Sequence, residues 1–86
     1  MKYVVLLESQ AEKELLSLPK TALKRIDARL QTLSQNSHPT GAIKLRGKEG
    51  EGWRIRAGDY RILYHIDEKQ NIIRIYRIKH RRDVYR

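Results

Sequence analysis

The chain has 86 residues, no cysteine and a formal net charge of +9. A chain of this length predicts a single domain over residues 1–86, and the lack of thiols excludes disulfides and thiolate metal sites. No apolar run is long enough to span a membrane, and the absence of cysteine fits the reducing cytoplasm.

The positive charge is concentrated in the second half of the chain. Residues 1–40 carry six Lys/Arg against four Asp/Glu, whereas residues 41–86 carry thirteen against six. Most of the surplus is arginine, whose planar guanidinium pairs with phosphate oxygens and stacks on bases. The sequence therefore predicts a nucleic acid or an acidic protein as partner. An anionic membrane is disfavoured, because these arginines fall on expected strands and not on an amphipathic helix.

The first third of the chain predicts one strand and two helices. The apolar stretch in residues 2–7 is too short for a signal peptide and predicts a buried strand. Ser9 and Glu12 have the spacing of a capping box, so a helix is expected to begin at Ser9, and Pro19 ends it. Its apolar side is formed by Leu15, Leu16 and Leu18.

A second helix is predicted over about residues 20–35, where apolar residues recur at helical spacing. These residues are Leu23, Ile26, Leu30 and Leu33. The short break between the two helices predicts an antiparallel helical hairpin. Residues 36–41, rich in Asn, Ser, Pro and Gly, are expected to form a loop.

From residue 43 onward, apolar and polar residues alternate, which is typical of half-buried strands. The segments with this period are 43–46, 53–57 and 60–65, with a further strand over about 72–78 and a hairpin loop at Asp67-Glu68. The element order predicts an α+β fold. An N-terminal strand and the helical hairpin would pack on one face of an antiparallel sheet of three to four strands.

Gly58-Asp59 predicts a two-residue type II′ hairpin turn. This turn would place Ala57 opposite Tyr60, Arg56 opposite Arg61, and Arg54 opposite Leu63. The face toward the helices would carry Trp53, Ile55, Ala57, Tyr60, Ile62 and Tyr64. The other face would carry Arg54, Arg56, Arg61, Leu63 and His65.

Two arginines directly opposite each other repel, so this pairing lowers the stability of the fold. Three on one face indicate a phosphate site, and a solvated outer face is the alternative interpretation. The tail from Lys79 onward adds His80, Arg81, Arg82 and Tyr85 at a strand end. A frayed basic terminus is the alternative there.

RNA can be cut without a metal when its 2′-hydroxyl attacks the adjacent phosphate. Arginines can stabilise the charged transition state, but they stay protonated and do acid–base work badly. Histidine titrates near neutral pH, so His80 is the first acid–base candidate, followed by Tyr85 and His65. His38, in the predicted loop, is interpreted as incidental. The sequence has no P-loop, no paired-histidine metal motif and no nucleophile elbow, and no cofactor is expected.

Three segments carry a resemblance to a known family: Leu45-Arg46-Gly47, residues 53–64 (WRIRAGDYRILY) and residues 78–85 (IKHRRDVY). They resemble RelE-type toxins of the RelE/ParE superfamily. The resemblance implies a RelE-like, microbial-RNase-like fold in one toxin domain over 1–86. It also implies a type II toxin that cuts mRNA in the ribosomal A site without a metal, and so inhibits translation.

The resemblance also implies roles for individual residues. Arg54 and Arg56 match a basic pair that is often lysine in RNA-cleaving members, where a lysine is the proposed base. Arg61 matches the arginine that contacts the scissile phosphate. Arg81 matches one implicated in transition-state stabilisation or leaving-group protonation, and Tyr85 one that orients the substrate or assists proton transfer. With arginine in place of lysine, His80 or a water takes the base role.

Six further basic residues are expected to bind RNA: Lys44, Arg46, Lys48, Arg74, Arg77 and Arg82. The partners that the resemblance implies are a RelB-like antitoxin, the 70S ribosome with its mRNA, and operator DNA only through the antitoxin complex. No membrane partner is expected. Two alternatives share the fold: a ParE-like inhibitor of DNA gyrase and a binding-only homologue that has lost activity.

Overall fold

The computed structural model describes residues 2–84, apart from the side chains of Glu49, Asp83 and Val84. The elements in chain order are β1 (Val4–Leu7), α1 (Ser9–Leu16), α2 (Lys20–Gln35), β2 (Ile43–Lys44), the 3-10 turn η1 (Gly47–Glu49), β3 (Trp53–Ala57), β4 (Tyr60–Asp67), β5 (Ile72–His80) and α3 (Arg81–Val84). Within residues 2–84, no helix is long and apolar enough to cross a membrane.

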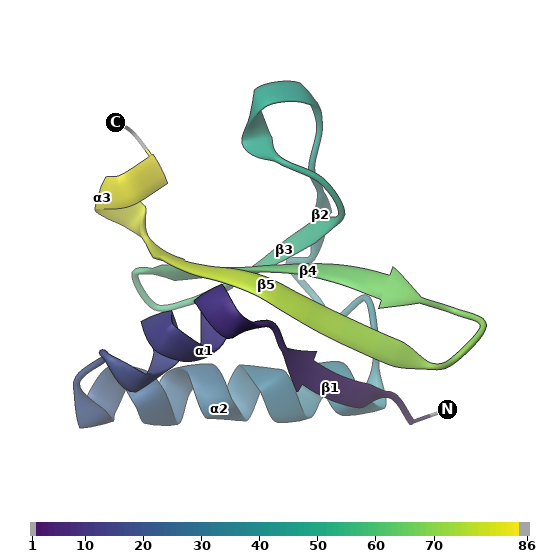
Figure 1. The fold of residues 1–86 in the computed structure, drawn as a ribbon, viewed down its shortest axis with the longest axis horizontal. Helices are drawn as coiled ribbons and strands as arrows, with labels where there is room; N and C mark the ends of the chain where they lie inside the picture. Colours follow the sequence, from purple (N-terminus) through teal and green to yellow (C-terminus); the bar gives the residue numbers. More distant parts are fainter. Residues whose placement is uncertain (1, 85–86) are drawn as a thin grey trace.

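The five strands form one mixed sheet in the order β1-β5-β4-β3-β2. Strands β2 to β5 are antiparallel neighbours, whereas β1 pairs with β5 in parallel, with Val5 opposite Ile73. Both longer helices lie on one face of the sheet, while the segment from β2 through η1 rises above the other (Figure 1). The predicted α+β fold is confirmed, and the parallel edge strand is an addition that the alternating pattern did not predict.

The core lies between the sheet and α2, whose buried residues recur every three or four positions, as an amphipathic helix requires. The buried cluster comprises Ala11, Ile26, Leu30, Leu33, Ile55, Ala57, Ile62, Tyr64, Ile73, Ile75 and Ile78. Trp53 and Tyr60 pack against it. The apolar face predicted for β3 and β4 is therefore confirmed.

Four local expectations need correction. Strand β1, expected to be buried, lies at the edge of the sheet and is only half buried, with Val4 58% and Leu6 39% exposed. Glu8, in extended backbone, caps α1 without a side-chain hydrogen bond, so the capping box of Ser9 and Glu12 does not form. Leu16 is 75% exposed, because the short α1 turns only Ala11 and Leu15 toward the core. Leu63, expected on the solvated face with the arginines, is buried, at 5% exposure.

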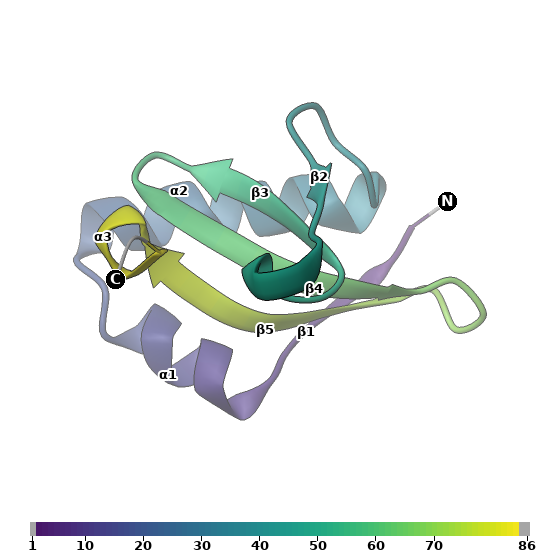
Figure 2. The same ribbon diagram turned by 90° about the horizontal axis from the view of Figure 1, so that it is seen from above.

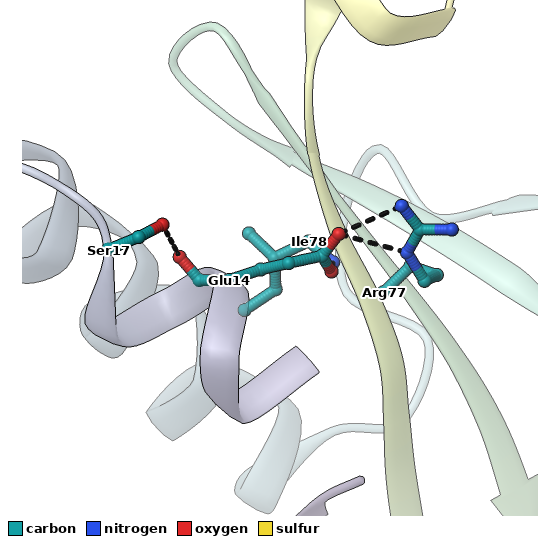
Figure 3. A network of polar contacts seen from close by, with 4 residues as sticks. All are labelled: Glu14, Ser17, Arg77 and Ile78. Carbon is teal, nitrogen blue, oxygen red and sulfur yellow. Dashed lines mark hydrogen bonds and ion pairs between the residues drawn. The ribbon is translucent and has the colours of Figure 1, made fainter. Parts of the chain in front are cut away.

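Helix α1 also supports the last part of β5. Strand β1 ends at Leu7, opposite Ile75, so β5 continues without a neighbour on that side. Glu14 fills this gap (Figure 3): Oε1 accepts from the Ile78 backbone N–H at 2.7 Å, and Oε2 accepts from Arg77 Nε at 3.0 Å and pairs with Nη2 at 2.8 Å. The free strand edge is thereby satisfied by a charged acceptor, which holds the strand end that leads into α3.

Candidate functional site

The turn between β3 and β4 has the predicted geometry. Ala57 lies opposite Tyr60, Arg56 opposite Arg61, and the register continues to Trp53 opposite Tyr64. Gly58 has a φ of 61°, and glycine adopts this left-handed region at little cost. Among the described non-glycine residues, Asn71 alone has a positive φ. Asp59 therefore has a negative φ, which identifies the turn as type II′.

A pocket of about 230 Å³ lies at this turn. Its lining residues are Arg56, Gly58, Asp59, Tyr60, Arg61 and Arg81. The cross-strand pair Arg56 and Arg61 comes from the hairpin itself, and Arg81 comes from α3, which lies beside the turn (Figure 2). The fold thus brings together three of the predicted catalytic residues, which are 25 positions apart at the extremes (81 − 56).

Arg81 is held at the pocket mainly by its backbone. Its N–H donates to the Asp59 carbonyl at 2.7 Å, while its guanidinium lies 3.8 Å from the Asp59 carboxylate. Both side chains are largely exposed, so this ion pair contributes at most about 1 kcal/mol. An anion entering the pocket can therefore replace Asp59 as the partner of Arg81 at low energetic cost.

His80, at the end of β5, adjoins the pocket without lining it. Its ring packs edge-on against Tyr60, with centroids 5.1 Å apart. Nδ1 accepts a hydrogen bond from the Arg82 backbone N–H at 3.2 Å. In the neutral ring the proton is then on Nε2, so His80 presents a donor and not a basic nitrogen to its surroundings.

Arg54 lies in a second pocket, of about 490 Å³. Its lining residues are Arg29, Thr40, Gly41, Ile43, Arg54 and Arg56. Arg29 was not predicted as a site residue, because a lone arginine on a helix usually belongs to its solvent-exposed face. Its proximity to β3 depends on how α2 packs against the sheet, which no local pattern encodes.

The six residues expected to bind RNA are spread over the molecule, and none of them lines either pocket. Lys44, Arg46 and Lys48 are exposed along β2 and η1, and Arg74 and Arg82 are also exposed. Arg77 is bound to Glu14. Tyr85 lies outside the described residues.

The other two histidines have packing partners away from the first pocket. His65 stacks on Tyr76 at 4.7 Å, and His38 packs edge-on against Trp53 at 4.4 Å. Tyr76 donates to the Glu51 carbonyl at 2.6 Å, and burial raises the pKa of its hydroxyl. The structure therefore does not bring His65 to the arginine pocket.

Tyr64 anchors the loop that borders the second pocket. Its buried hydroxyl donates to the Ser37 carbonyl at 2.9 Å. Burial raises the pKa of this hydroxyl to about 12, and nearby Arg29 opposes the shift. At neutral pH Tyr64 is therefore a neutral hydrogen-bond donor. Within residues 2–84, no group of three His, Asp or Glu side chains has an arrangement that would hold a metal ion.

Comparison with known proteins shows the family. A model of the ParE toxin of type II toxin–antitoxin systems (parDE) matches residues 5–85. Toxin RelG of Mycobacterium tuberculosis is 32% identical over 87 residues, which cover 100% of this chain and 99% of RelG.

Two solved complexes share the fold. The archaeal RelE–RelB complex from Pyrococcus horikoshii contains a chain with 34% identity and a TM-score of 0.81, over 94% of this chain and 97% of that one. The toxin–antitoxin complex RelBE2 of M. tuberculosis gives 27% identity and a TM-score of 0.81, over 93% and 99%. The chain belongs to the RelE/ParE superfamily of toxins of type II toxin–antitoxin systems.

Proposed function

We propose that this toxin is an endoribonuclease that cuts mRNA in the ribosomal A site, without a metal, and so inhibits translation. The observation that supports it is the pocket in which Arg56, Arg61 and Arg81 meet at one hairpin turn. Guanidinium groups from separate elements around one cavity suit the spread negative charge of a phosphoryl transition state.

The proposed reaction needs the RNA, this chain's side chains and water. The 2′-oxygen attacks the adjacent phosphorus while the P–O5′ bond breaks, giving a 2′,3′-cyclic phosphate and a 5′-hydroxyl. Arg56, Arg61 and Arg81 bind the phosphate oxygens and stabilise their growing charge. His80 donates a hydrogen bond from Nε2 to the departing 5′-oxygen, which takes its proton from water as the P–O5′ bond breaks.

The strand that carries lysine in other family members does not supply the base here. Arg54 and Arg56 stay protonated at all relevant pH values, and Nδ1 of His80 already accepts a hydrogen bond from the Arg82 backbone N–H. We assign removal of the 2′-proton to a water molecule held at the pocket. Slower cleavage than in lysine-bearing family members follows from this assignment.

The proposed partners are a cognate RelB-like antitoxin and the 70S ribosome with its mRNA. Both similar solved structures are complexes of a toxin with its antitoxin. A net charge of +9 favours an acidic antitoxin segment and the ribosome's phosphates. Operator DNA is then contacted through the antitoxin complex.

The test is toeprinting on a translating reporter mRNA, with wild type beside Arg81→Ala and Arg61→Lys. We expect ribosome-dependent cuts at A-site codons with wild type and a loss of at least about 100-fold in cutting rate with Arg81→Ala. Arg61→Lys keeps the charge, so RNA affinity should survive while cleavage falls sharply. Lys13→Ala removes one exposed charge from α1, outside both pockets, and serves as the matched control.

One observation favours a second candidate function: the matching family model is that of ParE toxins. A ParE-like inhibitor would bind DNA gyrase and need no nuclease pocket. Growth arrest without any mRNA cuts, together with loss of gyrase supercoiling activity, would establish it. RNA binding with neither cleavage nor growth arrest would instead identify a binding-only homologue.

A further inference from the structure

The second pocket lies beside the first and shares one residue with it. Arg56 lines both, while Arg29, Thr40, Gly41 and Ile43 line only the second. In Figure 2, β2 and β3 lie over α2, which explains how a helix residue and two strands border one cavity. At about 490 Å³, it exceeds the first pocket of about 230 Å³.

The charge of this pocket is entirely positive. Three arginines line it, and none of the described lining residues is acidic. In the first pocket, by contrast, Asp59 lies beside Arg81. Arginines around one cavity repel each other, and an anion between them removes that repulsion.

Arg29 is fixed in place by packing and by one backbone contact. Its Nη2 donates to the Thr40 carbonyl at 3.4 Å, and its Nε is shielded from solvent without a hydrogen-bond partner. Among the side chains that the structure describes, no carboxylate lies at ion-pair distance from Arg29. Its guanidinium is thus preorganised toward a cavity in which no acidic side chain balances its charge.

The spacing of the two β3 arginines suits a nucleic-acid strand. Arg54 and Arg56 are two residues apart on β3, hence about 6.6 Å apart along it, a distance similar to one nucleotide step of an extended single strand. Ile43 is 46% exposed at the pocket and offers an apolar surface to a ribose or base. The two pockets can therefore hold successive phosphates of one nucleic-acid strand.

We propose that the second pocket binds the RNA phosphodiester adjacent to the one held in the first pocket, with Arg29 and Arg54 contacting its oxygens. This inference rests on the proposed function, because it takes RNA as the ligand. It assigns to Arg29, on α2, a role in substrate binding that is separate from the chemistry at the hairpin turn.

The experiment measures the affinity of the whole toxin for 2′-O-methyl RNA oligonucleotides, which lack the attacking hydroxyl, at several salt concentrations. Arg29→Gln keeps a donor for the Thr40 carbonyl and removes the charge. We expect affinity to fall about fivefold to tenfold and the salt slope to shrink by about 0.7, the value for one phosphate of a single strand. Lys24→Gln, an exposed residue on the same helix outside the pockets, is the matched control and should change neither.

A second pair of variants keeps the test valid if Arg29→Gln does not fold. Ile43→Glu places a carboxylate at the pocket and Ile43→Gln its neutral equivalent. We expect the fold to tolerate both, because Ile43 is 46% exposed and its polar replacements can reach solvent. We expect Ile43→Glu to bind RNA at least about fivefold more weakly than Ile43→Gln.

The outcomes separate this proposal from the proposed function. Ribosome-dependent cuts together with unaltered RNA affinity and salt slope in Arg29→Gln would overturn the second phosphate site alone. A weaker RNA affinity and a smaller salt slope in Arg29→Gln, in a toxin that makes no cuts, would support the second phosphate site and refute the proposed nuclease activity. Unchanged RNA binding with weaker antitoxin binding would assign the pocket to a carboxylate-bearing partner, and no RNA binding by wild type would overturn it outright.

Discussion

Replacing Glu14 by alanine is expected to destabilise the fold more than replacing Glu12, the other carboxylate of α1. The substitution removes the acceptor of the Ile78 backbone N–H, a residue only 3% exposed, and leaves Arg77 without its partner. Because β1 ends opposite Ile75, no strand is available to replace that acceptor.

The magnitude follows from two terms. A hydrogen bond to a charged acceptor contributes about 1.5–3 kcal/mol. The ion pair adds at most about 1 kcal/mol, since the Arg77 side chain is 38% exposed. We therefore expect Glu14→Ala to lower the free energy of unfolding by about 2–3 kcal/mol, and Tm by about 10–20 °C for a domain of this size.

The assay is urea unfolding followed by circular dichroism, beside two comparison variants. Glu14→Gln keeps an acceptor for the Ile78 N–H without the charge, and should lose about 1 kcal/mol. Glu12→Ala removes an exposed carboxylate from the same helix, and should lose no more than about 0.5 kcal/mol. A loss for Glu14→Ala equal to that of Glu12→Ala would refute the idea that Glu14 supports the end of β5.

Two further predictions concern Tyr64 and the glycines of the segment between β2 and β3. Since the pKa of Tyr64 is raised from 10.0 to about 12, its contribution to stability is complete below pH 10 and is lost as pH rises toward 12. Phenolate absorbance should show a component titrating near pH 12 that disappears in Tyr64→Phe. Gly52→Ala and Gly47→Ala both place alanine at a positive φ, which should lower the free energy of unfolding by about 1–2 kcal/mol. Only at Gly52 does the added Cβ collide with the Tyr64 carbonyl, so urea unfolding should show about 1–3 kcal/mol of extra loss there, and equal losses would contradict the packing.

Local patterns were sufficient for much of the fold. The helical spacing of Ile26, Leu30 and Leu33 predicted α2 with its observed bounds, residues 20–35. The glycine of Gly58-Asp59 predicted the turn, and the turn predicted the register of β3 and β4. These features depend on residues close together in sequence, so periodicity and turn chemistry encode them directly.

The candidate site was predictable to the extent that it depends on that hairpin. Arg56 opposite Arg61 follows from the turn alone. The position of Arg81 beside them required knowing that β5 pairs with β4 and extends to His80 before α3 begins. The basic tail at a strand end pointed to this region, and the resemblance to a known family pointed to Arg81 within it.

What the sequence determined by itself is the order and kind of the elements, the turn at Gly58 and the arginine pair across it. The tertiary structure decided the parallel pairing of β1 with β5, the use of Glu14 as an acceptor for a free strand edge, and the approach of Arg29 to β3. The physical reason is the same in each case. These contacts join segments far apart in the chain, and their geometry is set by packing against a shared core, which leaves no repeating pattern in the sequence.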